Sequence, residues 1–255
     1  MNKITEAFSG KKALITFITG GDPDIETTER LILTMADAGA DIIEIGIPFS
    51  DPVAEGQVIQ DASSRALAAG CTVDKLFDMV QRLRTKTAVP LLFMTYANPI
   101  FAYGKQRFMA KCREVGIDGV IVPDVPFEEM DEFEAECNAY DICPISLIAP
   151  TSGERAEKIA RQARGFLYCV SSLGVTGTRS NLDTSISALI SQVKKFSDIP
   201  CAVGFGISTP QQARDMAAIS DGVIIGSAIV KLIEKHGRDV EPVKDFVREV
   251  AQALK

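Results

Sequence analysis

The sequence predicts a (β/α)8 TIM barrel. Short apolar runs rich in Ile, Val and Leu alternate with segments of helical period, and this alternation continues through all 255 residues without a linker. Nearly continuous apolar strands are typical of a parallel sheet covered on both faces, and ~250 residues is a usual length for one such barrel. We therefore expect residues 1–255 to form a single domain, with a short extra helix at the N-terminus. An open doubly wound sheet is the alternative, but no GxGxxG motif follows the first strand to support it.

The elements follow one another in a regular order. The eight predicted strands are residues 13–19, 41–46, 91–96, 119–124, 144–149, 166–171, 201–206 and 222–226. The predicted helices are residues 26–38, 73–85, 105–115, 128–140, 154–163, 185–196 and 210–217, with another helix beginning near Ser227. Active sites of these barrels lie at the C-terminal ends of the strands. The residues that end each strand are therefore the candidates for chemistry.

Composition and charge exclude several classes of function. The net charge of −7 argues against a nucleic-acid partner, and no apolar stretch approaches the ~20 residues that span a membrane. The polar N-terminus lacks the apolar core of a secretion signal, so we expect a cytoplasmic protein. The six cysteines contain no CxxC pair and are expected to be reduced. The single histidine, His236, is predicted at a helix end, which argues against zinc and Ser–His chemistry.

A carboxylate interrupts the second predicted strand. Glu44 lies on the opposite strand face from Ile43 and Ile45. We expect the two isoleucines to meet the helices, which would point Glu44 toward the barrel mouth. A carboxyl group buried there would have a raised pKa, which suits an acid or base near neutral pH. The alternative is a structural glutamate satisfied by its neighbours.

The loop after this strand carries two more acidic residues, Asp51 and Glu55. Its prolines, among them Pro52, and its glycine indicate a shaped loop. If the loop folds over the mouth, Glu44 and Glu55 form a paired acid/base arrangement. The alternative for Glu55 is an exposed acidic loop.

Glycines gather at the ends of the last three predicted strands, in GVTG at 174–177, GFG at 204–206 and Gly226 followed by Ser227. Glycine lets the backbone approach a ligand closely, and the N–H groups at a helix start bind anions. The loops after strands 7 and 8 are the usual phosphate site of this fold. We therefore expect a small phosphorylated substrate.

The strand ends also exclude two kinds of aldolase. No lysine ends a predicted strand, whereas a Schiff-base aldolase needs one. The chain also lacks the His and carboxylate cluster of a metal-dependent aldolase. Acid–base catalysis without a cofactor remains.

At these residues the sequence resembles the tryptophan synthase α subunit family. The resemblance is carried by motifs in the family's order across nearly the whole chain: TGGDP at 19–23, IEIGIPFSDP at 43–52, YANP at 96–99, PDVP at 123–126, GVTG at 174–177, GFG at 204–206 and GSAIV at 226–230. The second motif is highly specific, while the glycine-rich ones are shared with other phosphate-binding barrels.

The resemblance implies a reaction: the retro-aldol cleavage of indole-3-glycerol phosphate to indole and glyceraldehyde 3-phosphate. Glu44 would protonate indole C3 and help the glycerol hydroxyl to lose its proton, and Glu55 would polarise the indole N–H. Thr176 would belong to a closing lid. The indole pocket would be lined by Phe17, Ile59, Met94, Tyr96, Ile121, Ile148 and Tyr168. The phosphate would be held by Gly177, Gly206, Gly226 and Ser227.

The resemblance also implies a partner. Indole would pass to a separate β subunit, which carries pyridoxal phosphate, in an α2β2 complex, and this chain would need no cofactor of its own. The loop with Asp51 and Pro52 and the loop with Asn98 and Pro99 would form much of the interface.

The chain departs from the family at the second carboxylate. The family usually has aspartate there, and Glu55 is one methylene longer. Gln57 also stands where proline is common. Glutamate can accept the same hydrogen bond if the loop backs away by roughly an ångström, although misplacement on that scale can cost ~10²-fold in rate.

Two other functions stay open at this point. One is a different phosphate-binding barrel enzyme, such as an isomerase of histidine or tryptophan biosynthesis. The other is a catalytically weak binding protein whose main role is to activate a β subunit.

Overall fold

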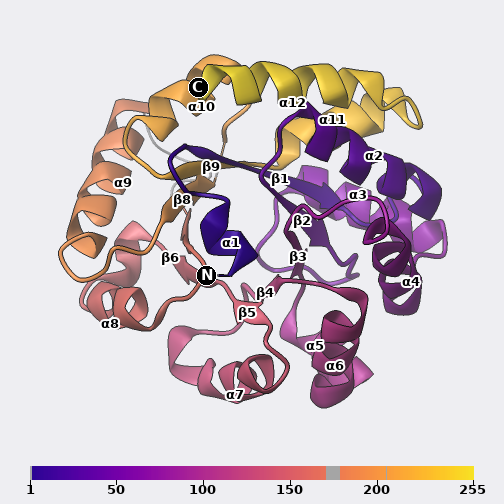
Figure 1. The fold of residues 1–255 in the computed structure, drawn as a ribbon, viewed down its shortest axis with the longest axis horizontal. Coiled ribbons are helices and arrows are strands. Elements are labelled where there is room, and N and C mark those ends of the chain that lie inside the picture. Colours follow the sequence, from indigo (N-terminus) through magenta and orange to yellow (C-terminus); the bar gives the residue numbers. More distant parts are fainter. Residues whose placement is uncertain (1, 171–178, 205) are drawn as a thin grey trace.

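The computed structural model describes residues 2–170, 179–204 and 206–255. The strands in these residues are β1 (Ala13–Thr19), β2 (Ile42–Gly46), β3 (Leu91–Met94), β4 (Gly119–Ile121), β5 (Cys143–Pro144), β6 (Ser146–Ile148), β7 (Leu167–Val170), β8 (Cys201–Gly204) and β9 (Gly222–Ile225). All described pairings are parallel, and helices surround the strands (Figure 1). The predicted barrel is confirmed.

The barrel closes through a split strand. The strand order is β5-β4-β3-β2-β1-β9-β8-β7-β6, so β5 and β6 are the two ends of the sheet. Only Ile145 separates these ends in the chain, and its N–H donates to the Val120 carbonyl at 2.9 Å. The strand predicted at 144–149 is therefore two short strands. Pro144 contributes to the break because it has no N–H to donate to a ladder.

Twelve α-helices lie in the described part of the chain. They are α1 (Lys3–Glu6), α2 (Ile25–Ala38), α3 (Gln57–Ala68), α4 (Val73–Leu83), α5 (Ala97–Tyr103), α6 (Lys105–Val115), α7 (Asp131–Ala139), α8 (Arg155–Gln162), α9 (Arg179–Val193), α10 (Pro210–Ala217), α11 (Ser227–His236) and α12 (Glu241–Ala253). Short 3-10 turns at Phe127–Glu129 and Pro150–Ser152 precede α7 and α8. The predicted bounds of α6 and α10 are confirmed. Helices α3, α5 and α12 were not predicted.

Several predicted strands are too long. β3 ends at Met94 and β4 at Ile121, not at 96 and 124. Tyr96 instead precedes the first turn of α5 as its N-cap. Pro123 follows the end of β4, where proline cannot donate to a ladder. The last residues of the predicted β7 and β8 strands fall partly outside the described residues.

The interior of the barrel is filled by apolar side chains from the inward faces of the strands. The inward-facing cluster includes Ile15, Ile42, Leu92, Ile121, Ala202 and Ile224. Helix α1, the predicted N-terminal helix, closes the N-terminal end of the barrel (Figure 1), where Ile4 is fully buried. The ring of Phe8 lies 5.5 Å from that of Phe166. One end of the barrel is therefore sealed, which leaves the C-terminal end for a site.

Candidate active site

Glu44 points into the barrel from β2. Ile43 and Ile45 belong to the apolar layer under the helices, whereas Ile42 belongs to the barrel interior. Strand alternation then turns Glu44 inward, as the sequence predicts. Its side chain has 0% exposure, and neither carboxyl oxygen has a hydrogen-bond partner among the described residues. The alternative of a glutamate satisfied by its neighbours does not hold there.

Burial controls the protonation of Glu44. Removal from water disfavours the charged form and raises the pKa of this carboxyl to about 8. Tyr168 of β7 lies close enough that the Glu44 charge adds to burial in raising the pKa of its hydroxyl. At neutral pH the Glu44 carboxyl is therefore mostly protonated and can donate a proton.

Glycines make room for two aromatic rings at the mouth. A Cβ atom on Gly46 would lie 2.7 Å from the ring of Phe17, and one on Gly204 would lie 2.6 Å from the ring of Tyr168. Phe17 is also the register partner of Glu44. The absence of side chains at these two glycines leaves the space that the rings occupy, near the buried carboxyl.

The apolar wall around Glu44 comes from several elements. Phe17, Ile59, Ala62 and Val230 form a buried cluster, here called the mouth cluster, against which Met94 packs. Ile121 lies deeper, in the barrel interior. Such a wall suits a flat aromatic ligand.

Ile148 does not join this wall. It packs between β6 and helices α8 and α9, with Ala156 and Ile159 among its neighbours. Leu147 faces the barrel interior instead. The prediction of Ile148 as a pocket residue is wrong by one position. Because side chains alternate along a strand, a shift of one residue moves a side chain to the other face.

The loop between β2 and α3 packs against Tyr96. The Tyr96 hydroxyl accepts the Ala54 N–H at 3.0 Å, and the rings of Phe49 and Tyr96 lie 5.4 Å apart. The Gln60 amide donates to the Glu55 carbonyl at 2.8 Å. The loop is thus held at the mouth.

Glu55 is half-buried in this loop rather than exposed. Burial raises the pKa of its carboxyl to about 7, against the opposing effect of a hydrogen bond with the Tyr96 side chain. No ion pair or hydrogen bond joins Glu55 to Glu44 within the described residues. The two glutamates therefore have separate environments and separate pKa values.

The predicted phosphate residues divide into two groups. Gly226 precedes the first turn of α11, Ser227 opens that helix and is exposed, and Gly206 follows β8 with φ 69°. The first N–H groups of a helix have no partner within the helix and can bind an anion. Gly177 and the predicted lid residue Thr176 lie outside the described residues.

One prediction about the partner surface, the location of Asn98 and Pro99, is wrong. Asn98 and Pro99 lie in the first turn of α5, not in a loop. Proline is tolerated there because its missing N–H has no helical partner. Asp124, for which no role was predicted, accepts the Ala97 N–H at 3.0 Å and supports this helix start. Asp51 and Asn98 are exposed, and Pro52 and Pro99 are half-buried.

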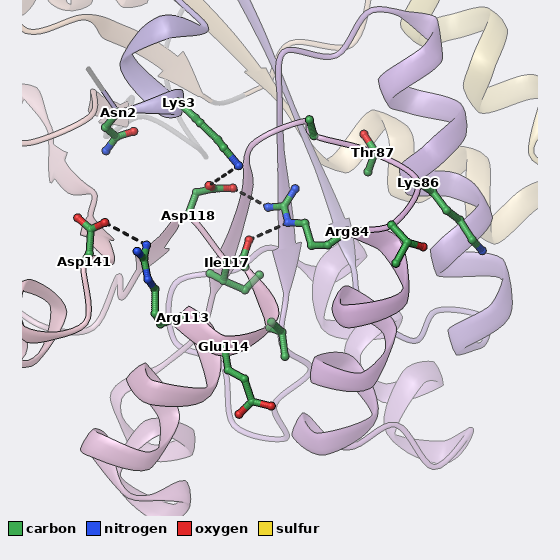
Figure 2. Close-up of a pocket in the computed structure, with 14 residues that line it drawn as sticks. Asn2, Lys3, Arg84, Lys86, Thr87, Arg113, Glu114, Ile117, Asp118 and Asp141 are labelled. Carbon is green, nitrogen blue, oxygen red and sulfur yellow. Dashed lines mark hydrogen bonds and ion pairs between the residues drawn. The ribbon is translucent and has the colours of Figure 1, made fainter.

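A polar hollow of about 820 Å³ opens at the opposite end of the barrel (Figure 2). Among the residues that line it, Arg84 donates to the Gly116 carbonyl at 2.7 Å and to the Asp118 carboxylate at 2.6 Å. These contacts tie the loop after α4 to the loop after α6. Residues at the N-terminal face of such barrels serve stability rather than catalysis.

The described residues hold no group of three or more His, Cys, Asp or Glu side chains arranged for a metal ion. None of the described helices is long and apolar enough to cross a membrane.

Comparison with known proteins gives one consistent result. A family model described as tryptophan synthase alpha chain matches residues 5–255. The chain belongs to the tryptophan synthase alpha chain family. A tryptophan synthase alpha chain from Lacticaseibacillus casei is 46% identical over 255 residues, which cover 100% of this chain and 96% of that one. One from Geobacter sulfurreducens is 48% identical and covers 98% of each chain.

Solved structures agree with this assignment. Tryptophan synthase subunit alpha from Legionella pneumophila superposes with a TM-score of 0.90 at 36% identity, covering 100% of this chain and 98% of that one. A Mycobacterium tuberculosis tryptophan synthase structure gives a TM-score of 0.90 at 31% identity, with 99% and 98% covered.

Family membership fixes the reaction class. The tryptophan synthase alpha chain is a lyase of tryptophan biosynthesis that cleaves indole-3-glycerol phosphate, and it pairs with a β subunit. The family is cofactor-free, and pyridoxal phosphate belongs to the β subunit. The predicted family, lyase class and partner are confirmed.

Proposed function

We propose that Glu44 is the acid and base that cleaves indole-3-glycerol phosphate in this chain, with assistance from Glu55. The observation that carries the proposal is the Glu44 carboxyl itself: it is fully buried, points into the barrel and has a pKa raised to about 8. A carboxyl group that stays protonated at neutral pH can donate to a carbon atom.

The proton balance of the reaction suits a single shuttling group. Cleavage moves one proton from the glycerol hydroxyl to indole C3 while the bond between C3 and the glycerol chain breaks. The Glu44 carboxyl first protonates C3. The resulting carboxylate then takes the hydroxyl proton, the carbonyl of glyceraldehyde 3-phosphate forms, and the bond electrons return to the indole ring. Glu44 ends in the protonated form in which it began.

Glu55 is proposed to accept the indole N–H. It must be ionised for this, and its pKa of about 7 leaves a large ionised fraction near neutrality. The contact with Tyr96 supports this role, because it fixes the longer side chain that this member has in place of the family's usual aspartate.

The substrate then spans the mouth. We assign the indole ring to the wall formed by Phe17, Ile59, Met94, Tyr96, Ile121, Leu147 and Tyr168. The phosphate is assigned to Gly206, Gly226 and Ser227, together with Gly177.

The surface at Asp51, Pro52, Asn98 and Pro99 is proposed to bind the β subunit. The neighbouring Val53 is 79% exposed, so an apolar side chain is available to a partner at this surface.

We also propose that residues 1–255 act as one domain, that the chain itself uses no cofactor and that it works in the cytoplasm. The six free, buried cysteines are typical of a reducing compartment.

The direct test is indole release from indole-3-glycerol phosphate by the full chain, alone and with a β subunit. We expect release in both cases and no requirement for an added cofactor. A chain that activates a β subunit but releases no indole would contradict the proposal and favour a binding role. Turnover of phosphoribosyl substrates instead would indicate an isomerase.

A further inference from the structure

Three elements meet beside the mouth: β1, α3 and α11. The mouth cluster joins them through Phe17 of β1, Ile59 and Ala62 of α3, and Val230 of α11. Under the proposed function, α3 supplies part of the indole end of the site, because it carries Ile59 and follows Glu55. The first turn of α11 supplies part of the phosphate end. The contact between these helices therefore lies between the two ends of the substrate.

An ionic network of Asp22, Arg65 and Glu234 also joins α3 to α11 and to the turn after β1. Arg65 follows Ala62 by three residues on α3, and Glu234 follows Val230 by four residues on α11. Such spacings place each residue on the same helix face as the cluster residue before it. Arg65 Nη1 lies 3.0 Å from Glu234 Oε1.

The other side of the Arg65 guanidinium binds the turn after β1. Arg65 Nε and Nη2 each lie 2.9 Å from one carboxylate oxygen of Asp22, which is 1% exposed. A two-point contact of this kind fixes the plane of a guanidinium, which a lysine ammonium cannot reproduce. Asp22 fixes the orientation of the guanidinium and therefore the position of Nη1. The contact between Nη1 and Glu234 then fixes α11 relative to α3.

We propose that Arg65 is a positioning residue that sets the spacing between the indole end and the phosphate end of the site. The inference rests on the proposed function for the location of those ends. Arg65 touches neither end and acts through α3 and α11. A substrate that spans both ends depends on their spacing, whereas a ligand that occupies one end does not.

The test variant is Glu234→Gln, which weakens the link to α11 by replacing the ion pair with a neutral contact and leaves Arg65 bound to Asp22. Glu234 is 51% exposed, so its loss should change stability little. Arg65→Lys is the second variant and should act in the same direction. Asp141→Asn is the matched control: Asp141 binds Arg113 of α6 at 3.0 Å, another exposed ion pair at the same distance with the same change of charge. Thermal unfolding checks the fold of each variant.

Four quantities are measured with the full chain and its β subunit: KM and kcat for indole-3-glycerol phosphate, and the inhibition constants of indole and of glycerol 3-phosphate. In Glu234→Gln we expect KM to rise about fivefold while kcat and both inhibition constants stay within about twofold. A KM no higher than that of Asp141→Asn would overturn the inference. A rise in both inhibition constants that matches the rise in KM would also overturn it. Such a result would mean that each end of the site binds its own ligand less well, and not that the spacing between the ends has changed. If the unmodified chain releases no indole, the proposed function fails instead.

Discussion

Glu44 and Phe17 are register partners on neighbouring strands, so a carboxyl group without a hydrogen-bond partner in the described residues lies beside a phenyl ring at the barrel mouth. Burial of a polar group without a partner costs stability. The arrangement therefore favours a proton donor but lowers the stability of the fold. The loss can be measured as a change in the free energy of unfolding.

Glu44→Gln should stabilise the protein at neutral pH. Between the ordinary pKa of 4.5 and the folded pKa of about 8, the unfolded chain releases a proton that the folded chain keeps. Stability consequently falls as pH rises through this window, by up to ~1.4 kcal/mol per pH unit. We expect the variant to gain about 2–3 kcal/mol in the free energy of unfolding at pH 7 and little near pH 4.5, measured by chemical denaturation.

Glu29→Gln is the control of opposite sign. Burial acts to raise the pKa of Glu29, but hydrogen bonds from Lys86 and Arg82 outweigh it and lower that pKa. The ionised form thus stabilises the fold, and its loss should destabilise the protein at pH 7. If Glu44→Gln were no more stable than the unmodified chain at any pH, the result would contradict a raised pKa for Glu44.

The pH dependence of kcat/KM should be bell-shaped. Below about pH 7 Glu55 is protonated and cannot accept the indole N–H, and above about pH 8 Glu44 has lost the proton that it must donate. Activity should fall on both sides of this narrow window. Glu55→Gln should lack the acidic limb. A flat profile in the unmodified chain would contradict both assignments.

Tyr96→Phe should shift the acidic limb of that profile to higher pH. The hydroxyl accepts the Ala54 N–H, and its hydrogen bond with Glu55 lowers the pKa of that carboxyl. Without it the Glu55 pKa rises and the loop loosens, so kcat/KM at pH 7 should fall about tenfold. Tyr103→Phe is the control, because its hydroxyl binds Asp74 at 2.7 Å, away from Glu55. An unmoved acidic limb in Tyr96→Phe would show that Tyr96 does not tune Glu55.

Asn98→Arg should weaken β-subunit binding without harming the isolated chain. Asn98 is exposed on the first turn of α5, so a longer charged side chain fits the free protein but obstructs a partner. We expect at least about a tenfold loss of affinity by titration calorimetry, with unchanged basal indole release. Gln192→Arg, an exposed substitution on α9, is the control. Equal affinities in the two variants would place the interface elsewhere.

The sequence predicts much of this architecture because burial leaves a local pattern. The inward turn of Glu44 follows from strand alternation between Ile43 and Ile45. The pocket role of Ile148 is implied by the family resemblance and is wrong by one residue, because in the short strand after Ile145 it is Leu147 that faces the barrel interior. Helices α3 and α5 begin directly after shaped loops, where turn-forming residues conceal the helical period.

The Arg65 network could not be predicted in this way. Its partners Asp22 and Glu234 are 43 and 169 residues away in the chain, so no local spacing indicates the contacts. Only the closed barrel brings these carboxylates to one guanidinium. The half-burial of Glu55 likewise depends on the packing of its loop against Tyr96.

The most direct test is single-turnover cleavage of indole-3-glycerol phosphate by Glu44→Gln, with substrate binding measured separately. Glutamine keeps the size of the side chain but cannot exchange a proton with C3 or the hydroxyl. We predict that the cleavage rate falls at least ~10²-fold while the dissociation constant changes little. A glutamine variant that cleaves the substrate at the unmodified rate would contradict the role of Glu44 as the acid and base.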